Sequence, residues 1–166
     1  MRSQRSILLK SWVIMIMSTN KDIVISTKVT TDQKLLAIRA CDSAFTISVI
    51  NRPNFEELFQ KIDTLAEFVI VTSDKSPIGY AAMYANDLVT KEAFITLIGV
   101  NSDYQGEHIG SRLMDNCILL ARKNGMNIVR LEVLDVDKGA QAFYRKQGFW
   151  EDGRCSRESI YMKKVL

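Results

Sequence analysis

The sequence predicts an α/β fold of three layers, in which a mixed β-sheet lies between two layers of helices. In the first half of the chain, apolar runs of strand length follow one another as in an antiparallel meander. In the second half such runs alternate with amphipathic helical segments, as in parallel sheets. Hydrophobic residues make up 47% of the 166 residues, which is enough to form the core of one domain.

One strand and two helical segments are predicted at the start of the domain. Residues 22–29 alternate between apolar and polar side chains like a strand, and residues 32–41 have the spacing of a short helix or turn. Residues 51–54, which contain a proline, interrupt the chain. Residues 54–66 are then predicted as an amphipathic helix. Its apolar residues recur at helical spacing and are Phe55, Leu58, Phe59, Ile62 and Leu65.

Three apolar runs follow this helix. Residues 68–72 and 78–84 are separated by a polar loop that contains Pro77, a composition typical of a hairpin. Residues 93–100 are apolar almost without interruption, which predicts a central strand covered on both faces.

Helices and strands alternate in the last third of the chain. Residues 109–123 form an amphipathic helix that an Asn-Gly pair ends. Its apolar stripe consists of Ile109, Leu113, Cys117, Leu120 and Ala121. Residues 128–134 are predicted as a strand, whose buried face consists of Val129, Leu131 and Val133. A helix over residues 138–147 and a strand over residues 160–165 complete the predicted fold.

We predict a single domain over residues 21–166, preceded by an N-terminal extension over residues 1–20. Basic residues precede an apolar run at 7–17, as in a signal peptide, but Lys10 interrupts the run and no small-residue cleavage site follows. The run has about half of the roughly 20 residues that cross a bilayer. Two alternatives stay open: the domain starts near Met17, or the extension packs on the core.

Charge and cysteine content exclude several classes of protein. The 22 basic and 19 acidic residues give a net charge of +3, which is too small and too scattered to indicate a nucleic-acid partner. The three cysteines lie far apart and lack metal-ligand spacing, so we expect neither a disulfide framework nor a bound metal. We therefore expect a cytoplasmic protein without a membrane partner. Monomer and homodimer both stay open.

The segment over residues 98–111 has the features of an anion site. It runs from a buried strand through a short loop into the start of the 109–123 helix. The first amides of a helix have no intrahelical acceptor, and the helix dipole adds a partial positive charge there. Gly106 and Gly110 allow an anion to approach the backbone closely. The segment therefore predicts a site for a pyrophosphate group.

Four short segments together resemble the ordered motifs of the GNAT (Gcn5-related N-acetyltransferase) superfamily. They are LIGV at residues 97–100, YQGEHIG at 104–110, LEV at 131–133 and AFYRKQGF at 142–149. The resemblance implies a three-layer α/β/α GNAT-like fold whose mixed sheet is splayed at its centre. It also implies an acyl-CoA-dependent N-acetyltransferase that uses acetyl-CoA as co-substrate and needs no metal.

The same resemblance assigns residues to acetyl-CoA. The end of the central strand pairs with the pantetheine arm in this family, and the loop after it cradles the pyrophosphate. The residues assigned in this way are Ile98, Gly99, Val100, Gln105, Gly106, Glu107, His108, Ile109, Gly110, Ser111, Asp137 and Tyr144. Gly99 is also a candidate for the bulge usual in the family strand, with simple packing as the alternative.

Two positions depart from the family pattern. His108 stands where the first glycine of the loop is usual. If that position requires a positive φ, histidine tolerates it better than most residues other than glycine, and binding through the backbone survives. Asp137 stands where an asparagine is usual, seven residues before Tyr144. Contact with the cofactor and an N-cap role for the following helix are both open for Asp137.

The resemblance and the chemistry of acyl transfer together assign catalytic roles. In this family a strand N–H, here that of Val100, holds the oxyanion, and a tyrosine, here Tyr144, protonates the departing thiolate. The amine must also lose a proton before it attacks. Glu132 is the candidate base, with Asp87 and a chain of water molecules as alternatives.

The acceptor depends on the half of the chain with the weaker patterns. Residues 20–92 are expected to bind it, including the 41–59 segment and the strand with Tyr80 and Tyr84. Residues 45–62 look similar to GNAT members encoded with polysaccharide biosynthesis enzymes, which implies a small-molecule amine such as an amino sugar. A peptide or protein amine is the alternative. A CoA-binding module without turnover is the alternative from another class.

Overall fold

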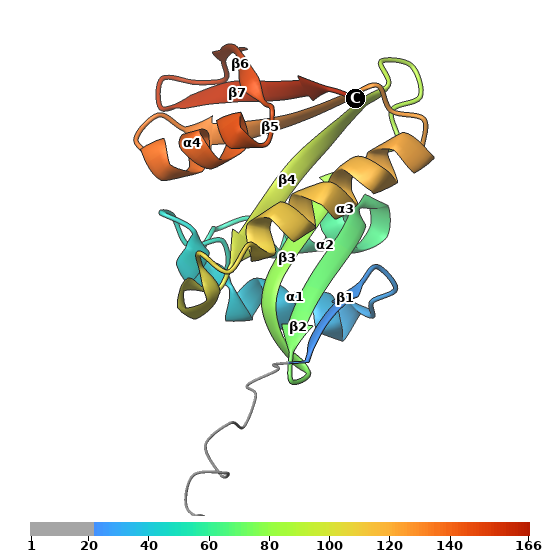
Figure 1. Ribbon diagram of the computed structural model, residues 1–166, viewed down its shortest axis with the longest axis vertical. Coiled ribbons are helices and arrows are strands. Elements are labelled where there is room, and N and C mark those ends of the chain that lie inside the picture. The colour runs from blue at the N-terminus through green and yellow to red at the C-terminus, as the bar shows by residue number, and fades with distance from the viewer. Residues whose placement is uncertain (1–21) are drawn as a thin grey trace, which may run out of the picture.

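A computed structural model describes residues 22–166, which form one seven-stranded sheet and four α-helices (Figure 1). The strands are β1 (Ile23–Ser26), β2 (Glu67–Ser73), β3 (Ser76–Tyr84), β4 (Glu92–Val100), β5 (Ile128–Leu134), β6 (Trp150–Arg154) and β7 (Ser159–Val165). The helices are α1 (Thr31–Ala40), α2 (Phe55–Leu65), α3 (Ile109–Lys123) and α4 (Lys138–Lys146), with 3-10 turns at Asp42–Ala44 and Ser102–Tyr104. The predicted extension over residues 1–20 lies outside the described residues.

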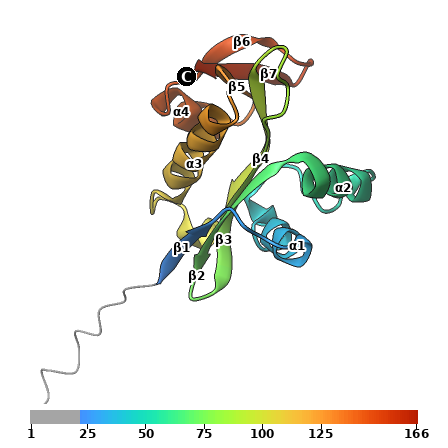
Figure 2. The ribbon, with the colours of Figure 1, turned by 90° about the vertical axis from the view of Figure 1, so that its right-hand side faces the viewer.

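Helices cover both faces of the sheet, so the predicted three-layer arrangement is confirmed. α3 and α4 lie on one face, whereas α1 and α2 lie on the other (Figure 2). The strand order is β1-β2-β3-β4-β5-β7-β6. Among the described strands only β4 and β5 are parallel neighbours, so the sheet is mixed.

The sheet is splayed at its centre, between β4 and β5. These strands pair over a short stretch only, from Glu92 with Ile128 to Ile95 with Leu131. Farther along, β4 stays paired with β3 and β5 stays paired with β7, but no ladder joins β4 to β5. The split therefore leaves backbone groups without a strand partner in the middle of the sheet.

A bulge in β4 reverses the direction in which its side chains point. Ala82 pairs with Leu97, whereas the next residue, Met83, pairs with Ile95. Thr96 is therefore the extra residue on β4. Ile95 packs in the core under α3, and Leu97 packs in the core under α1 and α2. The reversal explains why β4 reads as a continuous apolar run.

The expected bulge at Gly99 is wrong. Gly99 pairs regularly with Tyr80, and the irregularity lies at Thr96. A Cβ on Gly99 would lie 2.9 Å from Cε2 of Phe45, closer than side chains tolerate. The alternative, packing, is therefore the physical reason for glycine at this position.

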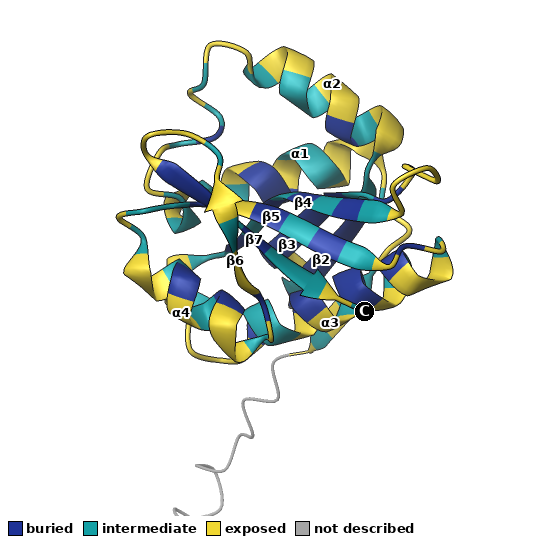
Figure 3. Cartoon of the chain, turned by 90° about the horizontal axis from the view of Figure 1, so that it is seen from above, coloured by how far each residue is buried: buried dark blue, intermediate teal, exposed yellow. Residues whose placement is uncertain are grey.

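Buried residues form two cores, one on each face of the sheet (Figure 3). The helical stripe predicted for residues 109–123 is confirmed for most of its members, although Leu120 is only partly buried. α2 buries Ile62, whereas Leu65, at the end of its predicted stripe, is 49% exposed. Amphipathic spacing thus identified the buried face of each helix but not which residues at the helix ends are exposed.

Most predicted elements lie where the sequence places them, and α3 and β5 have the predicted bounds. The segment from residue 32 is a full helix, because Thr30 and Gln33 form a capping box at its start. The first strand is shorter than the predicted 22–29. The sequence does not predict β6, because Trp150–Arg154 is largely polar and lies at the edge of the sheet.

Among residues 22–166 no helix is long and apolar enough to cross a membrane.

Candidate active site

Two cavities meet where β4 and β5 separate. The large cavity, about 650 Å³, lies between the end of β4, the N-terminus of α3 and the inner side of α4. The small cavity, about 340 Å³, lies between the separated strands and the segment that follows α1. Residues that line both cavities are Ala44, Ile98, Asp137, Ala140 and Tyr144. Molecules bound in the two cavities would therefore meet at this junction.

The end of β4 turns backbone groups toward the split in the sheet. The Asn101 N–H donates to the Ile78 carbonyl at 2.9 Å, next to the pair formed by Gly79 and Val100. Hydrogen-bonded and non-hydrogen-bonded pairs alternate in an antiparallel ladder. The N–H and C=O groups of Val100 and Ile98 therefore point away from β3, to the side from which β5 has diverged. An extended polar chain can pair with β4 there.

The N-terminus of α3 supplies a second set of donors to the large cavity. Arg112 N–H donates the first helical hydrogen bond, to the His108 carbonyl at 3.2 Å. The amides of Ile109, Gly110 and Ser111 therefore precede the helical ladder and lie at the positive end of the helix dipole. His108 has a φ of 62° and its side chain makes no capping bond. This position therefore does require a positive φ, and His108 adopts it.

The ends of α3 and α4 are held together beside these donors. Gln147 Nε2 donates to Ser111 Oγ at 3.0 Å, and Lys164 Nζ donates to the Gln147 carbonyl at 2.7 Å. The two bonds join the start of α3, the end of α4 and strand β7. They therefore fix the wall of the large cavity that faces the β4 edge.

All residues assigned to acetyl-CoA line the large cavity except Glu107. Glu107 is exposed, and its amide donates within the loop, to the Tyr104 carbonyl at 3.4 Å. The assignment of Glu107 to the site is therefore not supported by its position. The cavity is also lined by residues that sequence reasoning missed: Ala44, Tyr104, Gly139, Ala140, Phe143, Lys146 and Gln147. Three of these belong to the AFYRKQGF motif, which was the signal that could have found them.

Asp137 caps α4. Its Oδ1 accepts a hydrogen bond from the Ala140 amide at 2.9 Å, and the helix begins at the next residue. The N-cap alternative for Asp137 is therefore confirmed. Because Asp137 also lines both cavities, its contact with a cofactor stays a prediction.

Tyr144 lies at the junction of the cavities. Only 8% of its surface is exposed, and its ring contacts those of Phe143 and Phe149, with centroids 5.4 and 6.1 Å away. Burial, with the charge of Asp137 as a smaller cause, raises the pKa of Tyr144 above its ordinary value. Its phenol is therefore protonated at neutral pH. Phe143, the preceding residue, is only partly buried, because α4 turns Tyr144 inward instead.

The two candidate bases lie in different places. Glu132 lines the small cavity, and its carboxylate accepts a hydrogen bond from the Ser159 hydroxyl. Asp87 lines neither cavity, and its carboxylate accepts from the Val89 and Thr90 amides, at 3.0 Å each, in the loop after β3. Asp87 therefore holds a turn, and its position does not support a role as the base.

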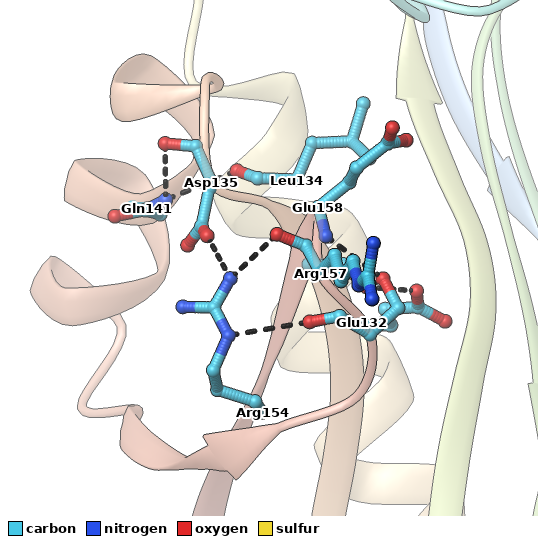
Figure 4. Close-up of polar contacts among 9 residues, drawn as sticks. Glu132, Leu134, Asp135, Gln141, Arg154, Arg157 and Glu158 are labelled. Carbon is cyan, nitrogen blue, oxygen red and sulfur yellow. Dashed lines mark hydrogen bonds and ion pairs between the residues drawn. The ribbon is translucent and has the colours of Figure 1, made fainter.

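Polar contacts fix the start of α4 to the end of β5 (Figure 4). Gln141 is buried, and its Nε2 donates to the carbonyls of Leu134 and Asp135 at 3.0 and 3.2 Å. Arg154 pairs with the Asp135 carboxylate and donates to the Arg157 carbonyl at 2.8 Å. The Gln141 bonds set the position of α4, and with it Tyr144, relative to β5, and the Arg154 contacts hold Asp135 at the end of β5.

The small cavity is built partly by the segment expected to bind the acceptor. Residues 44–47 and Arg52 line it from one side, and residues 94–98 and 131–134 line it from the two separated strands. Tyr80 and Tyr84 line neither cavity, so the position of these tyrosines does not support a role in acceptor binding. Both belong to the part of β3 that α1 and α2 cover.

Comparison of the sequence with models of protein families identifies one matching family. Residues 35–149 match the model described as the acetyltransferase (GNAT) family. An uncharacterised N-acetyltransferase of Methanocaldococcus jannaschii is 35% identical over 88 residues. That match covers 51% of this chain and 39% of the archaeal protein, so the matched part is less than half of the relative's length.

Solved structures resemble this chain over most of its length. The PaiA N-acetyltransferase of Thermoplasma acidophilum, solved in complex with coenzyme A, has a TM-score of 0.68 at 17% identity, and the match covers 87% of this chain and 99% of that one. The ribosomal-protein-S18-alanine N-acetyltransferase of Escherichia coli has a TM-score of 0.70 at 22% identity, with 87% and 94% covered. At sequence identities this low, these structures show that the chain shares their fold and nothing more.

Proposed function

Because this chain belongs to the acetyltransferase (GNAT) family, we propose that it transfers the acetyl group of acetyl-CoA to a primary amine, by direct attack of the amine. The observation that carries the proposal is the meeting of two cavities at Tyr144, inside the splayed sheet. The large cavity has the features of a CoA site. The small cavity opens onto the same point and offers a separate place for the amine.

The residues of the large cavity fit acetyl-CoA. The amides at the start of α3 offer donors to a pyrophosphate, and Gly110 adds no side chain in front of them. The backbone groups of Ile98 and Val100 offer the pantetheine amides a strand to pair with. When bound, acetyl-CoA supplies a thioester carbonyl that an amine can attack.

Three groups of the chain carry out the proposed reaction. Glu132 accepts the proton that the amine must lose before it attacks. The Val100 N–H, which points into the split, stabilises the charge that develops on the carbonyl oxygen. Tyr144, whose raised pKa keeps it protonated, gives a proton to the departing thiolate.

The size of the small cavity supports a small-molecule acceptor, such as an amino sugar. At about 340 Å³ it lies near the lower end of the range of about 300–1,000 Å³ for small-molecule sites. A peptide amine is the second candidate, because the fold resembles that of the Escherichia coli ribosomal-protein-S18-alanine N-acetyltransferase. A peptide acceptor would place only its terminal residue in this cavity.

An acceptor screen with thiol release as readout tests the proposal. Amino sugars, polyamines, amino acids and peptides are each mixed with acetyl-CoA, and thiol release without an amine is subtracted. Calorimetry with acetyl-CoA on the same protein measures binding independently. Thiol release that depends on a particular amine supports the proposed transfer. Tight binding of acetyl-CoA without release for any amine supports a CoA-binding module instead.

A further inference from the structure

Arg52 is the only basic residue among the described residues that line the small cavity. It lies in the loop between the Asp42–Ala44 turn and α2, a segment that sequence reasoning linked to the acceptor without naming a residue. The other charged residues of this cavity are Glu132 and Asp137, both on the side of β5 and α4. The lining thus combines one cation with two carboxylates.

Hydrogen bonds hold the backbone of Arg52 in place, whereas its side chain forms no hydrogen bond or ion pair with the described residues. Its amide donates to the Val49 carbonyl at 3.3 Å, and its carbonyl accepts from the Phe55 amide at 3.0 Å. Within residues 22–166, the guanidinium of Arg52 donates no hydrogen bond shorter than 3.5 Å and forms no ion pair shorter than 4.0 Å. Arg52 is therefore a half-buried residue of the cavity lining, and the five N–H donors of its guanidinium are available to a ligand.

Asp42 is the acidic residue near Arg52, but its carboxylate oxygens accept hydrogen bonds from the loop that carries Arg52. One oxygen accepts from the Val49 and Ile50 amides at 2.7 and 3.2 Å, and the other accepts from the Ser48 hydroxyl at 2.7 Å. These bonds, with a smaller effect of the Arg52 charge, outweigh burial and lower the pKa of Asp42. Asp42 therefore shapes the loop that carries Arg52, and its charge acts on Arg52 without a hydrogen bond or ion pair between the two side chains.

We propose that Arg52 selects the acceptor, so that the preferred substrate is a small amine that carries a carboxylate or phosphate group. This inference rests on the proposed function, because it names the substrate class of the same site. The guanidinium binds the anionic group through paired hydrogen bonds, which carboxylates and phosphates both accept. The amine then extends toward Glu132 and the junction at Tyr144. Polyamines, which lack an anionic group, leave the guanidinium unpaired beside a second cation.

Calorimetry with matched pairs of amines tests this assignment without requiring turnover. One pair is an amino acid and its carboxamide, and the other is an amino-sugar phosphate and the unphosphorylated amino sugar. Each is titrated into the full chain in the presence of CoA. The variant Arg52→Gln is compared with Arg39→Gln, which removes the same charge from an exposed position on α1, away from both cavities.

We expect the anionic member of at least one pair to bind about 10–100-fold more tightly than its neutral partner, the range of a charge-assisted hydrogen-bonded pair. Arg52→Gln should remove that preference and leave the affinity for CoA unchanged, whereas Arg39→Gln should preserve it. Which pair shows the preference distinguishes carboxylate from phosphate. Equal binding of both members of both pairs would overturn the assignment of Arg52. Absence of turnover alongside an Arg52-dependent preference would instead contradict the proposed reaction.

Discussion

Gly110 at the start of α3 lies against the ring of Phe143 on α4, so closely that a Cβ on Gly110 would be 3.2 Å from Cζ of Phe143. The contact joins the helix that offers amides to the large cavity to the helix that carries Tyr144. A side chain at position 110 must therefore displace the aromatic ring or the helix. The absence of that side chain sets how closely the two helices approach beside the cavity.

A substitution of Gly110 should weaken acetyl-CoA binding. Gly110→Asp adds bulk beside Phe143 and a negative charge at the anion site, so we expect a loss of about 1–3 kcal/mol in binding free energy. Gly110→Ala adds the bulk without the charge and serves as the matched control. Calorimetry on both folded variants measures the difference. Unchanged affinity in Gly110→Asp would rule out the start of α3 as the pyrophosphate site.

The Tyr144→Phe variant should lower the rate of acyl transfer. It keeps the buried ring but removes the proposed proton donor, so we expect kcat to fall by about 10²–10⁴-fold with acetyl-CoA affinity nearly intact. Tyr84→Phe removes a hydroxyl that lines neither cavity and is the control. Pre-steady-state measurement separates the chemical step from product release. A chemical step as fast as in the parent would make Tyr144 a packing residue.

Replacement of His108 by glycine should stabilise the protein. His108 has a φ of 62° and an exposed side chain without a capping bond. Because glycine adopts this conformation without the steric cost that other residues have, we expect a gain of about 0.5–1 kcal/mol in the free energy of unfolding. His108→Ala, which keeps the cost, is the control. Chemical denaturation that shows Gly and Ala variants of equal stability would contradict this account.

Stability should fall at alkaline pH, in part through Cys117. Burial raises the pKa of Cys117 from 9.0 to about 12. Below pH 9 the thiol is neutral in both the folded and the unfolded chain. Above pH 9 it ionises in the unfolded chain only, so the free energy of unfolding decreases as the pH rises toward 12, by up to about 1.4 kcal/mol per pH unit.

The variant Cys117→Val isolates this effect, because valine has a similar volume and does not titrate. Denaturant unfolding at pH 8, 9 and 10 should show a shallower decline for Cys117→Val than for the parent. The comparison of slopes removes any constant change in stability that the substitution causes. Parallel declines would show that Cys117 does not contribute to the alkaline loss.

Elements whose character depends on neighbours along the chain could be predicted from the sequence. α3 and β5 have the predicted bounds because a 3.6-residue stripe and a two-residue alternation are local patterns. β6 lacks such a pattern, since its strand conformation depends on pairing with β7 at the sheet edge. The bulge at Thr96 also escaped prediction, because it is a property of the register between β3 and β4.

The sequence by itself determined the family motifs, and from them it predicted an anion site at the start of α3 and Tyr144 as the candidate acid. These depend on short segments with fixed spacing, because a strand, a tight loop and a helix N-terminus form one local unit. It also named Glu132, which lines the small cavity, but its other candidate base, Asp87, lies in a turn that lines neither cavity.

Only the tertiary structure decided how these parts meet. The split between β4 and β5 joins the two cavities at Tyr144, and the loop before α2 brings Arg52 to the small cavity. Such contacts join segments up to about half the chain apart, and no pattern within either segment specifies them. Their geometry is set by the packing of helices on a splayed sheet, which exists only once the whole fold has formed.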